Sequence, residues 1–333
     1  MKRVGTMDNE KTTIDDIAKA LGLSKSTVSR SISGKGRISA DTRQKVLDYI
    51  EENNYKPNPL AKGLSESKTY NVGWVIPGDD HLTSLYFYQK CLQGVISAAA
   101  KADYDVLITT IKKSDISGLK RITENHKVDG VILGRTLRKD EAIKYLKEQG
   151  IAFVVVGSTE EKGVIQVDND HVAACSELAS ILRMKGVKRA AFICGDTSQV
   201  VTNSRLQGFK EGMAGAKTQI FLDCNNNEKV NSAVEDAVSY GADCIVCEDD
   251  RICQMVMEKL KEMEVEIPGA LKLASFYDSK LLSNYKPQIT ALKYDPTELG
   301  MKACETLMAL INGEKVENRQ LMGYEVMLKG FTQ

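Results

Sequence analysis

The sequence lacks the features that would place it across a membrane or send it out of the cell. Its apolar runs fall far short of the ~20 residues that a membrane-spanning helix needs. The first residues, Met1 to Glu10, are polar and have none of the apolar core found in secretory signals. We therefore expect a cytoplasmic protein with no membrane partner, in which cysteines stay reduced.

Motifs for catalysis and for nucleotide cofactors are also missing. The three histidines, His81, His126 and His171, are far apart in sequence, and none accompanies a nucleophile motif. His126 and His171 are expected at the surface. There is no G-x-G-x-x-G motif and no P-loop. We predict no enzymatic activity and no cofactor.

The eight cysteines form no disulfide framework. Cys244 and Cys247 have C-x-x-C spacing, but no second pair follows and the nearest histidine is distant. Ile245 and Val246 between them indicate a buried strand, where cysteine behaves as a small apolar side chain. We therefore predict no metal or redox site.

The formal charge of zero hides an asymmetry between the two ends of the chain. Residues 1–64 contain 12 Lys/Arg and 8 Asp/Glu, a net charge of +4, so the remainder carries −4. A basic head on an acidic body suits nucleic-acid binding by the head alone. The length of 333 residues favours two to three domains.

Three short helices are predicted in the head. Apolar residues recur at helical spacing over 14–21, after a cap at Thr12 or Thr13. Gly22 supplies a tight turn and Ser24 caps the second helix. The third helix follows the cap Ser39. The expected core consists of Ile14, Ile17, Ala18, Leu21, Leu23, Val28, Ile32, Val46, Leu47 and Ile50.

Such a helix–turn–helix places its second helix in the major groove of DNA. That helix begins with Lys25 and Ser26 and carries Arg30. An arginine can bond guanine O6 and N7 together, and serine hydroxyls suit phosphates or base edges. The alternative is an ordinary solvated face of an amphipathic helix.

A conditional helix is predicted just after the head. Asn58 is a good N-cap and Pro59 fits the first helical position. A helix of about seven residues is too short to be stable alone, so it should order only against a partner surface. It would expose Leu60 and Leu64, which suggests a wedge into the minor groove. A plain linker is the alternative.

The head resembles that of the lactose/galactose repressor (LacI/GalR) family of bacterial transcription regulators, and the resemblance continues through the whole chain. The matching motifs are Thr13-Ile-Asp-Asp-Ile-Ala, Ser24-x-x-Thr-Val-Ser-Arg30, Ile38-Ser-x-x-Thr-Arg43, Tyr55-x-Pro-Asn58 and Ala61-x-x-Leu64. The resemblance implies a dimer on a pseudo-palindromic operator. It implies base contacts from Lys25, Ser26 and Arg30, a minor-groove wedge from Leu64, and backbone contacts from Thr13, Ser24, Thr27, Ser29, Ser39, Tyr55 and Asn58.

The body alternates short apolar runs with helical stretches, which is typical of α/β proteins with parallel sheets covered by helices on both faces. Strands are expected over 72–76, 105–109, 130–133, 152–156, 190–194, 219–222, 244–247 and 271–275. Helices are expected over 89–102, 140–148, 170–185, 205–214, 230–239 and 252–263. There are too many strands for one sheet, which favours two doubly wound lobes.

The resemblance makes these lobes a periplasmic-binding-protein-like core. The predicted divisions are a disordered lead-in (1–11), the helix–turn–helix domain (12–56), a hinge helix and linker (57–69), and the core (70–333). Lobe one would hold about 70–165 and 293–322, and lobe two about 166–292 and 323–333. The chain has no leucine-repeat tail of the kind that makes tetramers, which favours a homodimer.

Ligands of doubly wound sheets bind beyond the carboxyl ends of strands, here between the lobes. The side chains expected at these ends are Phe87, Tyr88, Arg135, Arg205, Glu248 and Tyr277. Many family members have Asn at position 248 and Asn or Asp at position 277, so the specificity is not copied from a known sugar regulator. A carbohydrate is the first expectation, and a cationic or amino-bearing ligand is the second.

The sequence thus predicts a ligand-responsive repressor of a carbohydrate-utilisation operon. Two alternatives remain: a co-repressor-dependent regulator whose purine-like ligand stacks on the aromatic residues 86–88, and a sugar-binding protein without a regulatory role.

Overall fold

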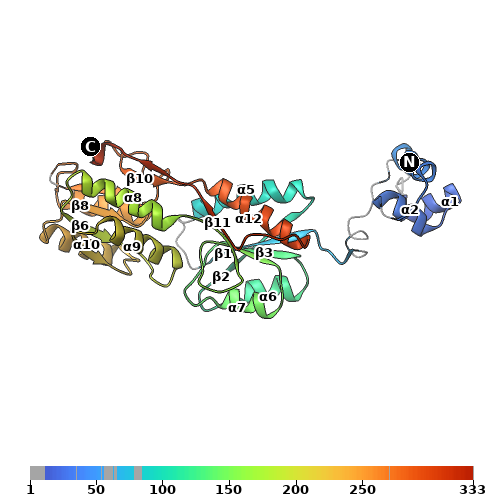
Figure 1. Cartoon of the computed structure of the whole chain (residues 1–333), viewed down its shortest axis with the longest axis horizontal. Helices are drawn as coiled ribbons and strands as arrows, with labels where there is room; N and C mark the ends of the chain where they lie inside the picture. The colour runs from blue at the N-terminus through green and yellow to red at the C-terminus, as the bar shows by residue number, and fades with distance from the viewer. Residues whose placement is uncertain are drawn as a thin grey trace, which may run out of the picture. The chain divides into compact units, whose positions relative to one another are not determined.

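A computed structural model describes residues 12–34, 36–53, 55, 63, 66–78, 85–269 and 271–332 (Figure 1). The chain divides into two compact units, 1–68 and 69–333, which we describe separately. The expected lead-in, Asn58, Leu64 and most of the expected hinge helix lie outside the described residues.

The first unit contains the three predicted helices, α1 (Ile14–Leu21), α2 (Lys25–Ser33) and α3 (Ala40–Glu52). Its buried centre is Ile17, Ala18, Val28 and Val46. The prediction for Leu47 was wrong, because its side chain is 40% exposed. Residues three and four positions after Val46, Tyr49 and Ile50, share its face of the helix and pack against the core instead.

The turn between α1 and α2 depends on Gly22, which has a φ of 66°. This left-handed conformation costs glycine little and ends the helix. The N–H of Leu23 then donates to the carbonyl oxygen of Ala18 at 2.9 Å. Thr13 and Ser24 cap the two helices through their side-chain oxygens, as the sequence predicted.

The described strands of the second unit form two six-stranded sheets. The first sheet is parallel throughout, in the order β11 (Arg319–Met322), β5 (Ile165–Asn169), β4 (Phe153–Val156), β3 (Gly130–Leu133), β1 (Asn71–Pro77) and β2 (Asp105–Ile111). The second has the order β12 (Glu325–Met327), β10 (Thr290–Lys293), β9 (Lys272–Ser275), β8 (Cys244–Cys247), β6 (Arg189–Ile193) and β7 (Lys217–Phe221). Only the β10–β12 pairing among these is antiparallel.

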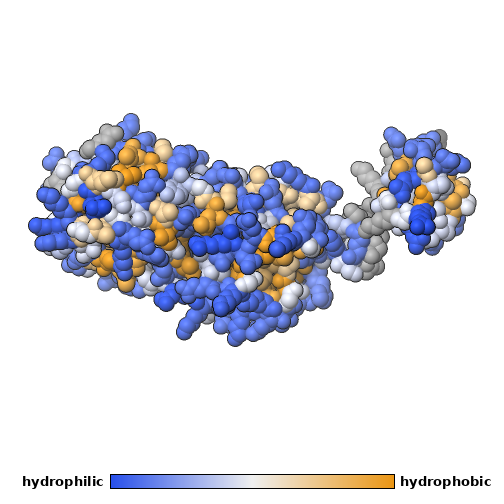
Figure 2. Space-filling model, in the orientation of Figure 1, coloured by the Kyte–Doolittle hydropathy of each residue, from blue (hydrophilic) through white to orange (hydrophobic). Residues whose placement is uncertain are grey.

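Helices cover both faces of each sheet. On the first sheet, α5 (Leu85–Lys101) and α12 (Pro296–Ile311) pack opposite α6 (Ser117–Glu124) and α7 (Glu141–Glu148), above and below the strands in Figure 1. On the second, α8 (His171–Met184) and α9 (Val200–Gly212) pack opposite α10 (Asn227–Ser239) and α11 (Asp250–Glu262). The visible surface of this unit is largely hydrophilic, with scattered apolar patches (Figure 2). No helix in the described part of the chain is long and apolar enough to span a membrane.

The predicted fold class is confirmed, and every predicted strand and helix of the body is present. The elements that sequence analysis missed are α6, α12, β5, β10, β11 and β12. The boundary expected near residue 165 falls at the first residue of β5, and this strand pairs within the first sheet. The chain therefore crosses to the second lobe after Asn169, returns after β10, and crosses again between β11 and β12.

Two glycines allow α5 and α12 to pack closely. A Cβ atom added to Gly94 would lie 1.9 Å from the carbonyl oxygen of Thr297, and one added to Gly300 would lie 2.0 Å from that of Cys91. Backbone atoms cannot move aside as the end of a flexible side chain can. The close packing against α5 thus fixes α12, the helix that follows the chain's return from the second lobe, to the first lobe.

We predict that Gly94→Ala lowers the free energy of unfolding by about 3 kcal/mol, the upper end of the usual cost of overpacking, because the added methyl group forces the two helices apart. Gly323→Ala is the control, since a Cβ there would meet nothing within 4 Å. Urea unfolding of both variants checks this. Equal stability of the two variants would contradict the close packing.

Candidate functional site

A cavity of about 420 Å³ lies at the carboxyl ends of strands from both sheets, between the two lobes. All the residues that the sequence predicted as effector ligands line it: Phe87, Tyr88, Arg135, Arg205, Glu248 and Tyr277. They come from α5, from α9 and from the loops that follow β3, β8 and β9. Their contact with an effector stays a prediction.

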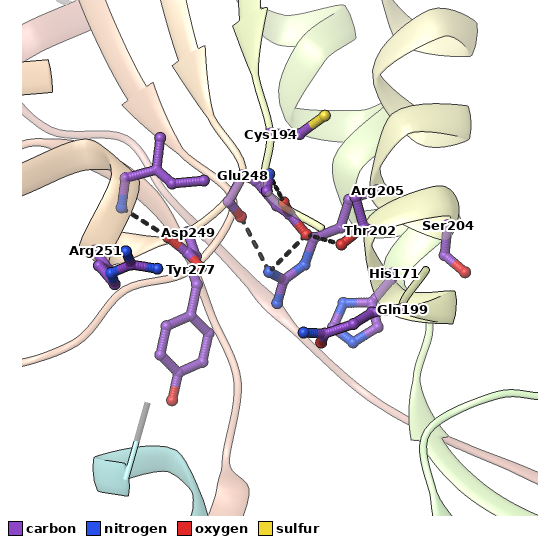
Figure 3. Close-up of polar contacts among 12 residues, drawn as sticks. His171, Cys194, Gln199, Thr202, Ser204, Arg205, Glu248, Asp249, Arg251 and Tyr277 are labelled. Atoms are coloured by element: carbon purple, nitrogen blue, oxygen red, sulfur yellow. Dashed lines mark hydrogen bonds and ion pairs between the residues drawn. The ribbon is translucent and has the colours of Figure 1, made fainter. Parts of the chain in front are cut away.

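Arg205 and Glu248 form a buried pair at the wall of this cavity (Figure 3). Arg205 is 8% exposed and Glu248 is 4% exposed. The Nη1 atom of Arg205 donates to the backbone oxygen of Glu248 at 3.1 Å and lies 4.0 Å from Oε1 of its carboxylate. Burial raises the pKa of Glu248, and the charge of Arg205 opposes that rise.

The carboxylate of Glu248 is already engaged within the protein. Its Oε1 accepts a hydrogen bond from the hydroxyl of Thr202 at 2.7 Å, and its Oε2 accepts one from the backbone N–H of Gly195. The sequence predicts that this carboxylate bonds an effector. In the structure both of its oxygens accept hydrogen bonds from other residues of the protein instead.

Two other polar atoms of the cavity-lining residues have no hydrogen-bond partner within the described part of the chain. These are Nε of Arg205, a donor, and Oδ1 of Asn169, an acceptor, and both are fully buried. An unsatisfied buried polar atom costs about 1–3 kcal/mol. A ligand that carries both an acceptor and a donor, as a hydroxyl group does, would remove this cost.

Aromatic rings form a second part of the lining. The rings of Tyr277 and Tyr294 are stacked, with centroids 6.2 Å apart and planes at 13°. Phe87 of the first lobe meets Tyr277 edge-on at 6.1 Å. Flat apolar faces with polar edges suit a sugar ring or a base.

His171 is buried in this cavity rather than at the surface, so that prediction was wrong. Its Nε2 lies 3.4 Å from Oδ1 of Asp168, and its Nδ1 lies 3.3 Å from the hydroxyl of Tyr294. Burial lowers the pKa of His171 against the raising effect of Asp168. His126 is exposed as predicted, and His81 lies outside the described residues.

The reason for this error is that β5 was missed. His171 opens the helix that follows β5, so it lies at the carboxyl edge of the first sheet, where the cavity is. The same omission hid Asp168 and Asn169, and missing β10 hid Tyr294. The signal was present in the segment 165–169, where apolar residues alternate with polar ones.

Acidic residues after β8 close another side of the cavity. Asp249 caps α11 by accepting a hydrogen bond from the N–H of Ile252 at 2.8 Å. Asp250 accepts a hydrogen bond from the hydroxyl of Ser279. Burial, together with the neighbouring charge of Asp249, raises the pKa of Asp250 from 3.8 to about 6.

Cys244 and Cys247 cannot share a metal ion, because they contribute to the cores on opposite faces of the second sheet. Within the described ranges, no group of three or more His, Cys, Asp or Glu side chains could hold a metal ion.

In the first unit, the predicted base-contacting residues Lys25, Ser26 and Arg30 are all exposed on α2. The predicted backbone-contacting residues Thr13, Ser24 and Ser39 cap the three helices. Ser29 is exposed and Thr27 is partly buried on α2, and Tyr55 packs against the core. The N-terminus of α2 is thus capped by Ser24, and the polar side chains at its start are exposed for contact with a partner.

Two family models match the chain. Residues 13–58 match "Bacterial regulatory proteins, lacI family", and residues 179–330 match "Periplasmic binding protein-like domain". The HTH-type transcriptional regulator MalR of Streptococcus pneumoniae serotype 4 is 28% identical over 95% of this chain and 99% of its own length.

Among solved structures, the fold is similar to that of the lac repressor dimer bound to operator and the anti-inducer ONPF. That match has a TM-score of 0.77 at 20% identity and covers 97% of this chain and 99% of the other. It is also similar to the transcriptional regulator CelR in complex with cellobiose, with a TM-score of 0.71 at 23% identity, covering 97% of this chain and 100% of the other.

We predict that Asp250→Asn stabilises the protein by about 3 kcal/mol at pH 8 and by only about 1 kcal/mol at pH 4.5, because the pKa of Asp250 is raised from 3.8 to about 6. The raised pKa means that the folded state binds the proton of Asp250 more tightly than the unfolded state does. Its favourable contribution is therefore present below about pH 4 and is lost as the pH rises through 6. Asparagine avoids that loss and can still accept from Ser279.

Urea unfolding at the two pH values measures this difference. Asp236→Asn, at an exposed position of α10, is the control. The prediction fails if Asp250→Asn changes stability equally at both pH values.

Proposed function

The chain belongs to the lacI family of bacterial regulatory proteins, whose members are DNA-binding transcription factors and not enzymes, and we propose that it represses a carbohydrate-utilisation operon in the cytoplasm. In this proposal a dimer binds a pseudo-palindromic operator. A small molecule in the inter-lobe cavity changes the affinity for that operator.

The head carries the DNA-binding part of the proposal. Lys25, Ser26 and Arg30 are exposed on the second helix of a helix–turn–helix, where side chains can reach base edges. The similar lac repressor structure is described as a dimer bound to operator. By analogy, two heads of this chain would each read one half-site.

The effector proposal rests on a cavity that is lined by aromatic rings and by Arg205 and Asn169, each of which carries a buried polar atom without a hydrogen-bond partner among the described residues. Hydroxyl groups of a sugar would satisfy both atoms, and Tyr277 and Tyr294 would pack against its ring. The similar CelR structure holds cellobiose. Arg205 would contact the ligand, while Phe87, Tyr88 and Arg135 would complete the surroundings.

A purine-like co-repressor is the second candidate, since aromatic rings also stack on bases. Tyr86, one of the rings invoked for it, does not line the cavity. The ammonium groups of Lys90 and Lys280 lie over its ring, 5.8 and 5.9 Å from the ring centroid. The carbohydrate is therefore favoured. Three neighbouring acids, Glu248, Asp249 and Asp250, would also suit an amino group. The experiment below therefore includes an amino-bearing ligand.

Control would pass through the segment 57–69, which we propose as a hinge helix and linker between the head (12–56) and the core (70–333). A ligand that changes lobe closure would change whether two such helices pair and whether Leu64 enters the minor groove. DNA and ligand must then alter each other's affinity by the same factor.

We predict that Arg30→Ala weakens binding to operator DNA at least tenfold, since a bidentate guanine contact is worth about 1–3 kcal/mol. Gel shifts on DNA from the gene's own promoter region measure this. Lys45→Ala removes the same charge from an exposed position on α3 and should leave the ratio of operator to non-specific affinity unchanged. Wild-type operator affinity of Arg30→Ala would contradict the proposed reading surface.

We predict that one of maltose, cellobiose or glucose raises the melting temperature of the protein, and that Arg205→Lys abolishes this shift. Lysine keeps the charge beside Glu248 but loses the Nε–H donor. Arg121→Lys, at an exposed position of α6, should keep the shift. Stabilisation by adenine, guanine or spermidine, and not by any sugar, would reject the carbohydrate.

A further inference from the structure

The two lobes are joined by non-covalent contacts on the rim of the cavity, in addition to the three crossings of the chain. We call residues 195–200, between β6 and the start of α9, the bridging loop. The N–H of Arg138 in the first lobe donates to the carbonyl oxygen of Ser198 at 2.9 Å. The N–H of Val200 donates to the carbonyl oxygen of Thr136 in the first lobe at 3.2 Å. These bonds make a short antiparallel bridge between Leu137 and Gln199.

An ion pair reinforces this bridge. Lys113, which follows β2 in the first lobe, pairs with Oδ2 of Asp196 in the bridging loop. The other oxygen of Asp196 accepts hydrogen bonds from the N–H and hydroxyl of Ser198, at 3.0 and 2.7 Å. Asp196 therefore shapes the loop and binds the opposite lobe at once.

Glu248 holds the bridging loop near both of its ends. One carboxylate oxygen accepts from the N–H of Gly195, where the loop begins, and the other accepts from the hydroxyl of Thr202, just after it ends. Glu248 also lies beside Arg205, which Figure 3 shows approaching the same carboxylate. One buried side chain thus connects the cavity to the segment that joins the lobes.

We propose that Glu248 is a positioning residue, which sets the bridging loop in the conformation that joins the two lobes and makes that junction depend on Arg205. This inference rests on the proposed function, because it takes the cavity as the effector site. The bridging loop contacts the first lobe through two backbone hydrogen bonds and one partly exposed ion pair, so these contacts can form and break while each lobe stays folded.

The chemistry of the carboxylate explains why glutamate is needed here. A carboxylate accepts hydrogen bonds at both oxygens, and it does so here at two separate points of the chain. An amide of the same size has one acceptor oxygen, which can keep the bond from Gly195, and an NH2 group, which can donate to the hydroxyl of Thr202. Glu248→Gln therefore keeps the volume of the side chain, but it removes the charge beside Arg205 and replaces two charge-assisted hydrogen bonds by weaker neutral ones, which loosens the loop.

Hydrogen exchange of the full-length protein, measured by mass spectrometry without ligand or DNA, tests the proposal. The reporters are the amides of Arg138 and Val200, which donate across the lobes. The within-lobe controls are the amides of Val131, which donates to Ala152, and Asp243, which donates to Arg189. We expect Glu248→Gln and Asp196→Asn to speed exchange of both reporters about tenfold and to leave both controls unchanged.

The matched control variant is Lys112→Gln, which removes one positive charge adjacent to Lys113 without touching Asp196. It should leave the reporters as in the wild-type protein. Lys113→Gln removes the ion pair and leaves the hydrogen bonds between Asp196 and Ser198 in place, so it should speed exchange of both reporters. Unchanged exchange in Lys113→Gln would overturn the role of the ion pair.

Arg205→Gln tests the link to the cavity, because Arg205 contacts neither reporter. Faster exchange of Arg138 and Val200 in this variant supports the link, and unchanged exchange overturns it. Reporters unchanged in Glu248→Gln, or controls that speed up as much as the reporters in Asp196→Asn, would overturn the positioning role. These measurements need no ligand and no DNA, so their failure is distinct from failure of the operator or sugar experiments.

Discussion

Arg205 has to be paired inside the protein, because an isolated buried cation costs several kcal/mol. Glu248 meets this need with its backbone oxygen and its carboxylate. The pairing fixes α9 against the end of β8, and the Nε donor of the guanidinium has no partner among the described residues. The rest of the cavity depends on this arrangement, since the bridging loop and Arg205 share the same carboxylate.

The topology explains why so many functional side chains meet in one place. Parallel strands all end at the same edge of a sheet, and here two such edges face one another across the cavity. Residues as far apart in sequence as Phe87 and Tyr277 therefore touch. Because the bridging loop and the facing aromatic rings join the lobes around the cavity, a ligand between the lobes is well placed to alter their closure.

Much of the fold could be predicted because its signals are local. In the head, the turn at Gly22, the cap at Ser24 and the helical spacing of the apolar residues around Ile17 and Val28 predict the first two helices directly. Uninterrupted apolar runs such as β3 and β8, each of four residues, predict strands that are buried on both faces. Edge or mixed strands such as β11, with the sequence Arg-Gln-Leu-Met, carry too little apolar pattern to be found. The residues lining the cavity were found only where the preceding strand was found.

The partners of those residues could not be predicted, because they depend on tertiary contacts. Nothing in the sequence near Glu248 indicates that Thr202 and Gly195 take up its oxygens. Leu47 was misplaced because position in a helix, and not apolar character alone, decides burial. The C-x-x-C pair shows the converse: the alternation of a strand places the two thiols on opposite faces, which the spacing by itself does not reveal.

The discontinuous lobes have a consequence for synthesis on the ribosome. The first lobe lacks α12 and β11 until residue 322 has been added, although its other strands are complete at residue 169. At about 5–20 residues per second, this delay is roughly ten to thirty seconds. During that time the part of the sheet face that α12 later covers, beside α5, stays exposed to chaperones and to other nascent chains. The head needs no later segment for its core, so it can fold long before the part that is proposed to regulate it.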